Sequence, residues 1–231
     1  MKIGIIAAMK AEAELIKKQL TEKREGTVGS VRYVTGKIGK CDVVLAVCGV
    51  GKVWAAICAE AMIIRFLPDI IINTGVAGTL TDRLSIGDIA VSSSVCHHDF
   101  DTTAFGDAPG AVMIPGVEGA QIPADEKIAD RIAAIAREEG INTVVGPIAS
   151  GDQFICDAKR KEKIVSTFCA VACEMEGAAI GHVCTANGVP FCVVRAISDS
   201  ADGDAPENFP EFVKESAEKS SHIVVKYIES L

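Results

Sequence analysis

The sequence has few aromatic residues, no excess of basic residues, no paired-cysteine motif and no long apolar run. Aromatic residues make up only 5% of the 231 positions, whereas hydrophobic residues make up 49%. The core must therefore be built from Val, Ile, Leu and Ala, which suits a parallel sheet covered by small-residue helices. The net charge of −8 leaves no basic excess to neutralise phosphates, and no run reaches the roughly 20 apolar residues that span a bilayer. We expect neither nucleic acid nor a membrane as a partner.

The nine cysteines are scattered and form no C-x-x-C pair. An odd number without framework spacing is typical of a reducing compartment, where buried cysteines behave as small hydrophobes. The N-terminal apolar stretch is too short for a secretion signal and has the pattern of a first strand. We therefore predict a cytoplasmic location. The one basic cluster, KRKEK at 159–163, is interpreted as the solvated start of a helix.

Val- and Ile-rich runs alternate along the chain with helical runs rich in Ala, Glu and Lys. Strands are expected at 2–8, 69–78, 87–101, 143–150, near 170–174 and at 190–199, and in a hairpin over 30–51 that turns at Gly39-Lys40. Helices are expected at 10–20, 52–66, 124–139, 158–168, 177–187 and 207–230, with a long loop over 105–123. This alternation predicts a single α/β domain over 1–231, with a central, mixed, mostly parallel twisted sheet and helices on both faces.

Ligands of such sheets collect at the carboxyl ends of the strands, so the residues that follow each strand are site candidates. Glu12 lies just beyond the first strand, in the first turn of a helix, where the helix dipole also favours an acidic residue. The strand over 69–78 ends in TGVAG. Its Gly75 and Gly78 would let backbone amides approach a ligand closely.

Two further segments carry charged residues in an apolar setting. In VACEMEG, Glu174 and Glu176 are two residues apart and could face one pocket, since alternate residues of a strand point the same way. In VVRAISDSAD, an apolar strand ends with Arg195, Ser198 and Asp199. Buried carboxylates are costly unless they are paired or used, although Ser and Asp are also common helix N-caps.

Three motifs are rejected. CGVGK has Val53 where a phosphate-binding P-loop needs Ser or Thr, and GVGKVW lacks the third glycine of a dinucleotide fingerprint. His97-His98-Asp99 has no further ligand cluster with matching spacing, so we expect no metal.

Seven motifs occur in order across nearly the whole chain: MKIGIIAAMKAEAE, GVGKV, IINTGVAG, GDIAVS, SGDQFI, EMEGAAI and VVRAISDSAD. Together they resemble those of the bacterial 5′-methylthioadenosine/S-adenosylhomocysteine nucleosidases, within the purine nucleoside phosphorylase superfamily. The resemblance implies a nucleoside phosphorylase-like fold, a homodimer and no cofactor. It also implies hydrolysis of an adenine N-ribosyl bond, with release of adenine and a 5-thio-substituted ribose, in methionine salvage and methyl-cycle recycling.

The resemblance also implies roles for individual residues. Asp199 would protonate the purine at N7, Glu12 would activate water, and Glu176 would hold the ribose hydroxyls above Met175. Phe154 would stack on adenine, whose edge the Ile155 backbone would read. Further substrate-binding positions are Met9, Val76, Gly78, Glu174, Arg195, Ser198 and Phe209 (a lid aromatic), and the partner-subunit pocket would contain Phe105, Met113 and Pro115.

The chemistry is coherent without the family. Cleavage builds an oxocarbenium-like sugar that carboxylates stabilise, and adenine leaves poorly unless an acid protonates it. A second carboxylate then activates water, as in inverting glycosidases, so the two acids need different protonation states at one pH.

Some alternatives remain open. A phosphorylase of the same fold would need cationic partners for phosphate, yet Asn73 stands where an Arg commonly precedes the TG loop. A futalosine-type nucleoside could replace the substrate, and a silent nucleoside-binding protein would need neither an acid nor a base. Val76 and Thr102 depart from the residues often found in the family, which bears on the pocket rather than on the chemistry.

Overall fold

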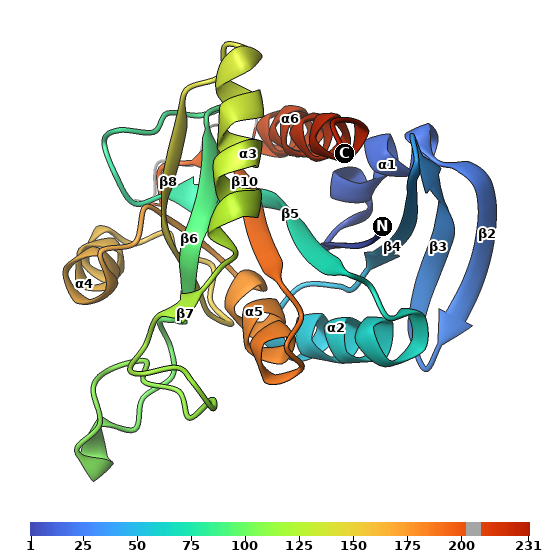
Figure 1. Ribbon diagram of the computed structural model, residues 1–231. Helices are drawn as coiled ribbons and strands as arrows, with labels where there is room; N and C mark the ends of the chain where they lie inside the picture. Colours follow the sequence, from blue (N-terminus) through green and yellow to red (C-terminus); the bar gives the residue numbers. More distant parts are fainter. Residues whose placement is uncertain (202–208) are drawn as a thin grey trace.

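The computed structural model describes residues 1–201 and 209–231, and side chains up to 201 and from 213 onward. Strands and helices alternate along it (Figure 1). The strands are β1 (Lys2–Ala7), β2 (Thr21–Val28), β3 (Val31–Ile38), β4 (Cys41–Val47), β5 (Ile70–Thr79), β6 (Ile89–His97), β7 (Ile122–Pro123), β8 (Thr143–Ser150), β9 (Ala172–Glu174) and β10 (Phe191–Asp199). The helices are α1 (Lys10–Gln19), α2 (Lys52–Phe66), α3 (Glu126–Glu138), α4 (Ala158–Phe168), α5 (Gly177–Ala186) and α6 (Phe209–Glu229), with one 3-10 turn at Thr103–Phe105.

All of these strands belong to one mixed sheet in the order β10-β6-β8-β9-β5-β1-β4-β3-β2, with β7 beside β6. Parallel pairs join β4 to β1, β1 to β5, β5 to β10, β6 to β8 and β8 to β9. Because β10 pairs with both β6 and β5, the strands β5, β10, β6, β8 and β9 close into a ring. The junctions β10–β6 and β5–β9 of this ring are antiparallel, and the second one places Gly78 of β5 beside Cys173 of β9.

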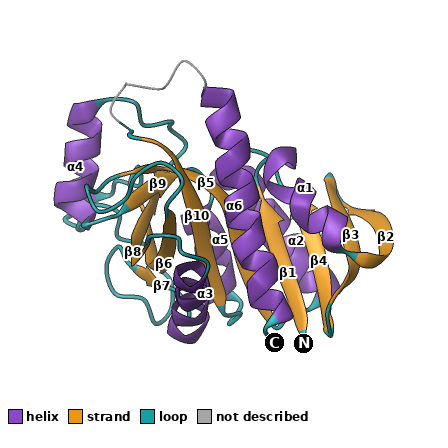
Figure 2. Ribbon diagram, turned by 90° about the horizontal axis from the view of Figure 1, so that it is seen from above, coloured by secondary structure: helices purple, strands orange, loops and turns teal. Residues whose placement is uncertain are grey.

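Helices cover both faces of the sheet, as Figures 1 and 2 show from two sides. One apolar core lies between the sheet and α2 and α5, and a second lies between the sheet and α1, α3 and α6. Both cores consist mainly of Ile, Val and Ala. The predicted α/β fold with helices on both faces is therefore confirmed. None of the helices in the described part combines the length and the apolar character that crossing a bilayer demands.

Two parts of the sheet differ from the sequence-based expectation. The hairpin turning at Gly39 is confirmed, but β2 was not predicted, and it extends this hairpin at the outer edge of the sheet. The expected loop over 105–123 begins with the end of the 3-10 turn and ends in β7. The 159–163 cluster lies on α4 as predicted, and its residues are largely exposed.

Candidate active site

The central feature of the site is the parallel pairing of β5 with β10. This register places Arg195 beside Gly75 and Asp199 beside Gly78, with a register shift at Ser198. Such a bulge re-aims the side chains that follow it, and bulges are frequent next to active sites. The TGVAG and VVRAISD motifs thus form one surface, as expected for neighbouring strand ends.

Glu12 is buried at the start of α1, and its carboxylate is held by three backbone amides. Oε2 accepts from Ala8 and Met9 at 2.9 and 2.8 Å, and Oε1 accepts from Val76 at 3.1 Å. A Cβ at Gly75 would lie 2.5 Å from Oε1, so this carboxylate needs glycine beside it. Burial raises the pKa of Glu12, against the lowering effect of Arg195 and the amides. Glu12 therefore does not only begin α1, since its carboxylate also contacts β5 at Gly75 and Val76.

Asp199 is also buried, at the end of β10. Its Oδ2 accepts from the Ser198 hydroxyl and its Oδ1 from the Ala201 amide, both at 2.9 Å. A Cβ at Gly78 would lie 2.7 Å from Oδ1. Two glycines of one strand thus give room to two carboxylates that come from different elements.

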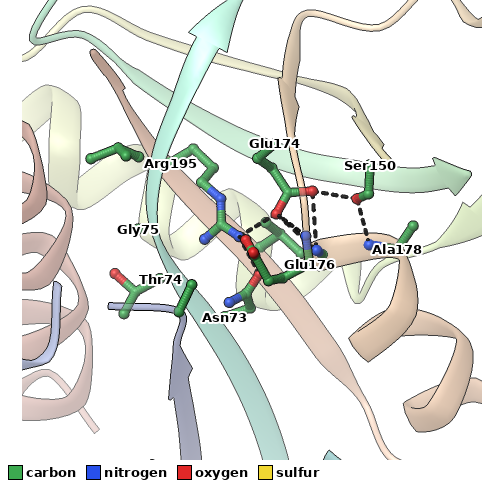
Figure 3. Close-up of polar contacts among 12 residues, drawn as sticks. Asn73, Thr74, Gly75, Ser150, Glu174, Glu176, Ala178 and Arg195 are labelled. Atoms are coloured by element: carbon green, nitrogen blue, oxygen red, sulfur yellow. Dashed lines mark hydrogen bonds and ion pairs between the residues drawn. The ribbon is translucent and has the colours of Figure 1, made fainter. Parts of the chain in front are cut away.

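Arg195 on β10 is almost fully buried, and its side chain points toward Glu174 and Asn73 (Figure 3). Its guanidinium pairs with Glu174, donates to Asn73 Oδ1 at 2.5 Å and lies 3.7 Å from Glu176 Oε2. Glu174 also accepts from the Ser150 hydroxyl and from the backbone amides of residues 176 and 177. Burial raises the pKa of Glu174, but Arg195 and these donors hold it below its usual value overall. Glu174 is thus a fully satisfied anion.

Glu176 has a different environment. It precedes α5, and among the described residues it accepts a hydrogen bond from the Gly51 amide at 2.9 Å in addition to its longer contact with Arg195. Burial, followed by repulsion from Glu174, raises the pKa of Glu176 to about 7. Because Glu174 ends β9 and Glu176 occupies the N-cap position of α5, the two side chains do not follow the alternation of a single strand.

A small cavity of about 30 Å³ lies beside Asp199. Six predicted site residues line it, together with two that the sequence analysis did not name, Gln153 and Cys173. The six are Gly78, Phe154, Ile155, Glu174, Met175 and Asp199. Phe154 is 54% exposed, whereas Ile155 is buried. Gln153 and Cys173 each adjoin a predicted residue, and that adjacency was the only signal that could have found them.

The other predicted residues are spread more widely. Met9 and Val76 contact Glu12 through their amides, whereas Phe105 and Met113 are 88% and 90% exposed and Pro115 is exposed too. Their loop extends away from the sheet in Figure 1. Phe209 begins α6, but its side chain lies outside the described residues, so its lid role stays a prediction.

Other features of the described structure lie away from these carboxylates. A cavity of about 780 Å³ is a groove between α1 and the β2–β3 hairpin, and none of the predicted site residues lines it. In the part of the chain that the structure describes, no group of three or more His, Cys, Asp or Glu could hold a metal ion. Thr102 has a buried hydroxyl with no partner among the described residues.

The arrangement can place carboxylates in different protonation states around one small molecule. Burial and the charge of Glu174 favour the proton on Glu176, whereas Arg195 keeps Glu174 ionised. Pairs of acids whose environments separate their pKa values are typical of acid–base catalysis. This chemistry suits cleavage of a bond that leaves positive charge on a sugar.

Comparison with known proteins agrees with this geometry. Residues 2–229 match the family model of the Phosphorylase superfamily. A 5′-methylthioadenosine/S-adenosylhomocysteine nucleosidase from Actinobacillus succinogenes is 43% identical over 100% of both chains. The chain therefore belongs to the Phosphorylase superfamily and, within it, to the family of 5′-methylthioadenosine/S-adenosylhomocysteine nucleosidases.

Two solved structures are similar over the whole chain. S-adenosylhomocysteine nucleosidase from Streptococcus pyogenes, in complex with 5-methylthiotubericidin, has a TM-score of 0.94 at 38% identity and covers 100% of this chain and 97% of its own. Futalosine hydrolase from Helicobacter pylori has a TM-score of 0.93 at 34% identity and covers 100% and 98%.

Proposed function

We propose that residues 1–231 form one nucleosidase domain that hydrolyses the adenine N-ribosyl bond of 5′-methylthioadenosine and S-adenosylhomocysteine. The observation that carries this proposal is the set of buried carboxylates around the glycine-containing end of β5. Glu12 and Asp199 approach it from different elements, as the two acids of an inverting hydrolysis must. In this proposal the activity serves methionine salvage and methyl-cycle recycling, as the family resemblance implies.

Each carboxylate has a separate role in the proposal. Asp199 donates the proton that lets adenine leave, and its side chain lines the small cavity together with Phe154 and Ile155. Glu12 accepts a proton from the attacking water. Glu176, held by the Gly51 amide, accepts hydrogen bonds from the ribose hydroxyls. Glu174 keeps Arg195 in place, because its oxygens already have donors.

Adenine release from methylthioadenosine, with and without phosphate, tests the reaction type. We expect the same rate in both conditions, because the buried Arg195 is already paired with carboxylates and offers phosphate no free cation. Asn73, which stands in the position of a phosphate-binding Arg, is itself a partner of Arg195. Release that requires phosphate would contradict hydrolysis and favour a phosphorylase.

A futalosine-type nucleoside is a second candidate substrate, because the chain is also similar to the Helicobacter pylori futalosine hydrolase. Both substrates share the N-ribosyl bond and differ in the 5′-substituent. The ratio of kcat/KM between methylthioadenosine and aminofutalosine separates them. We expect the thio-substituted nucleoside to be preferred, and a higher value for aminofutalosine would reverse the assignment.

The pH dependence of kcat/KM follows from Glu176. Because burial and Glu174 raise the pKa of Glu176 to about 7, and the ionised form binds the ribose, activity should rise with pH through this value. Below it, we expect kcat/KM to fall about tenfold per pH unit, and above it to reach a plateau. A flat profile between about pH 5 and 9 would contradict the scheme.

We also propose a cytoplasmic homodimer. An apolar stripe of residues is exposed at the start of α2 and along it, and it comprises Val50, Val53, Trp54, Ile57 and Ile64. A face of this kind fits an interface in which one copy completes the pocket of the other. The nine free cysteines fit a reducing compartment.

Replacing Trp54 by Glu tests the interface. We expect a wild-type dimer, and a variant that elutes as a monomer in size exclusion with light scattering, because a charge in the stripe opposes burial. Adenine release should fall with dimer content if the partner supplies Phe105 and Met113. A monomeric wild type would contradict the proposal.

A further inference from the structure

The segment that follows β6 contains Asp99, which the proposed reaction does not use. Asp99 Oδ1 accepts from Lys52 Nζ at 2.5 Å, and Oδ2 accepts from the Asp152 amide at 2.8 Å. The side chains of Asp99 and Lys52 are only 13% and 19% exposed. Burial raises the pKa of Asp99, but its bonds to Lys52 and to the Asp152 amide lower it overall, so the carboxylate stays ionised. This ion pair is shielded from solvent and specifically bonded.

Asp152 closes the cluster. Its Oδ1 accepts from the backbone amide of Lys52 at 2.7 Å. Lys52 is the first residue of α2, and Gly51 before it has no side chain with which to cap the helix. A residue 100 positions away in the chain therefore caps α2. Asp99, Lys52 and Asp152 thus form a ring, which we call the bracket.

Both Lys52 and Asp152 of the bracket lie close in sequence to residues of the proposed active site. Gly51, next to Lys52, donates its amide to Glu176 at 2.9 Å. Phe154 comes two residues after Asp152 and lines the cavity beside Asp199. We propose that the bracket positions the Gly51 amide against Glu176 and the 151–155 loop against the purine, and that Asp99 is the positioning residue that joins them. The inference rests on the proposed function for the roles of Glu176 and Phe154.

Loss of Asp99 would leave the Lys52 ammonium and the Asp152 amide without this partner. The two segments would then be free to move apart by a fraction of an ångström. A misplacement of about 1 Å can cost about 100-fold in rate. Loss of Asp99 should misplace the groups that bind the sugar and those that bind the purine together, because the bracket adjoins both the Gly51 amide and the 151–155 loop.

The test measures kcat, KM and melting temperature for Asp99→Asn, Lys52→Met, their double variant and Lys52→Arg. We expect kcat/KM to fall about 10- to 100-fold in Asp99→Asn and Lys52→Met. The double variant should be no worse than the poorer single one, because the two residues act through one ring. Lys52→Arg should recover most of the activity, since it keeps a cationic donor. Glu25→Gln is the matched control, because it breaks an exposed ion pair of 2.8 Å between Glu25 on β2 and Lys17 on α1.

Hydrogen exchange gives a readout that does not depend on activity. In Asp99→Asn we expect faster exchange at the Gly51 amide and over residues 151–155, with the sheet unchanged. Asp99→Asn with wild-type kcat/KM, additive effects in the double variant, or unchanged exchange at these amides would overturn the bracket. A wild type that releases no adenine would instead contradict the proposed function, and the exchange data would still decide whether the bracket holds the two segments.

Discussion

Replacing Asp199 by Asn should lower kcat for adenine release by about 1,000-fold, because a positioned general acid contributes about 100- to 10,000-fold. Asn keeps the shape of Asp and can still accept from Ser198 or Ala201, whose donors lie at 2.9 Å. Substrate binding should therefore change little, so that the loss falls on kcat rather than on KM. Steady-state adenine release together with calorimetric substrate binding measures the two effects separately.

A substrate whose leaving group needs no proton serves as the control for this variant. A p-nitrophenyl 5-methylthioriboside should lose far less activity in Asp199→Asn than methylthioadenosine does, since p-nitrophenolate leaves as an anion. Equal losses on both substrates would show that Asp199 supports the structure rather than protonates the base. Wild-type activity of the variant on methylthioadenosine would exclude the acid role altogether.

The sequence predicts most of the fold because most strands are buried and apolar. The runs that form β1, β5 and β10 have little alternative to the centre of a sheet, and their glycine or polar ends mark the turns. β2 escaped prediction because nearly all of its TEKREGTV residues are exposed at the sheet edge. An edge strand can be charged and solvated, so neither hydrophobicity nor alternation identifies it.

Strand ends also predict which residues enter the site, but not what each of them contacts. Glu174 and Glu176 look equivalent in VACEMEG, and only the fold distinguishes the carboxylate bonded directly to Arg195 from the one that accepts from the Gly51 amide and lies 3.7 Å from Arg195. The reason is that Arg195 and Gly51 come from distant parts of the chain. Partners of this kind decide which acid keeps its proton, and local sequence does not contain them.

Local sequence also fails to predict the environments of the residues in the His97-His98-Asp99 motif. Taken locally it suggests metal ligands, yet both ring nitrogens of His97 are buried without a partner in the described residues, and its ring packs 5.6 Å from that of His182. Asp99 turns away to Lys52 and Asp152. His97 and Asp99 thus have different environments, because each one contacts a different part of the chain.

Replacing Glu12 by Ala should lower kcat for hydrolysis by about 1,000-fold, since Glu12 is the proposed base for water and such a base contributes about 100- to 10,000-fold. The change also leaves the amides of Ala8, Met9 and Val76 without their acceptor. Each buried amide left unpaired costs about 1–3 kcal/mol, so the melting temperature should fall as well. Rates must therefore be expressed per folded molecule, from the folded fraction at the assay temperature.

Azide distinguishes a lost base from a damaged fold. It is a nucleophile that needs no deprotonation, and the shortened side chain gives it room beside Gly75, where the Glu12 carboxylate otherwise lies. Azide should therefore restore adenine release in Glu12→Ala and form a ribosyl azide, whereas it should do little for Asp199→Asn, in which the leaving group still lacks its proton. Rescue of both variants, or of neither, would contradict the assignment of the base to Glu12 and the acid to Asp199. The two rescue experiments thus test the acid and the base role against each other within one site. Removal of a carboxylate that only damages the fold would lower the rate of adenine release, but azide would not restore that rate.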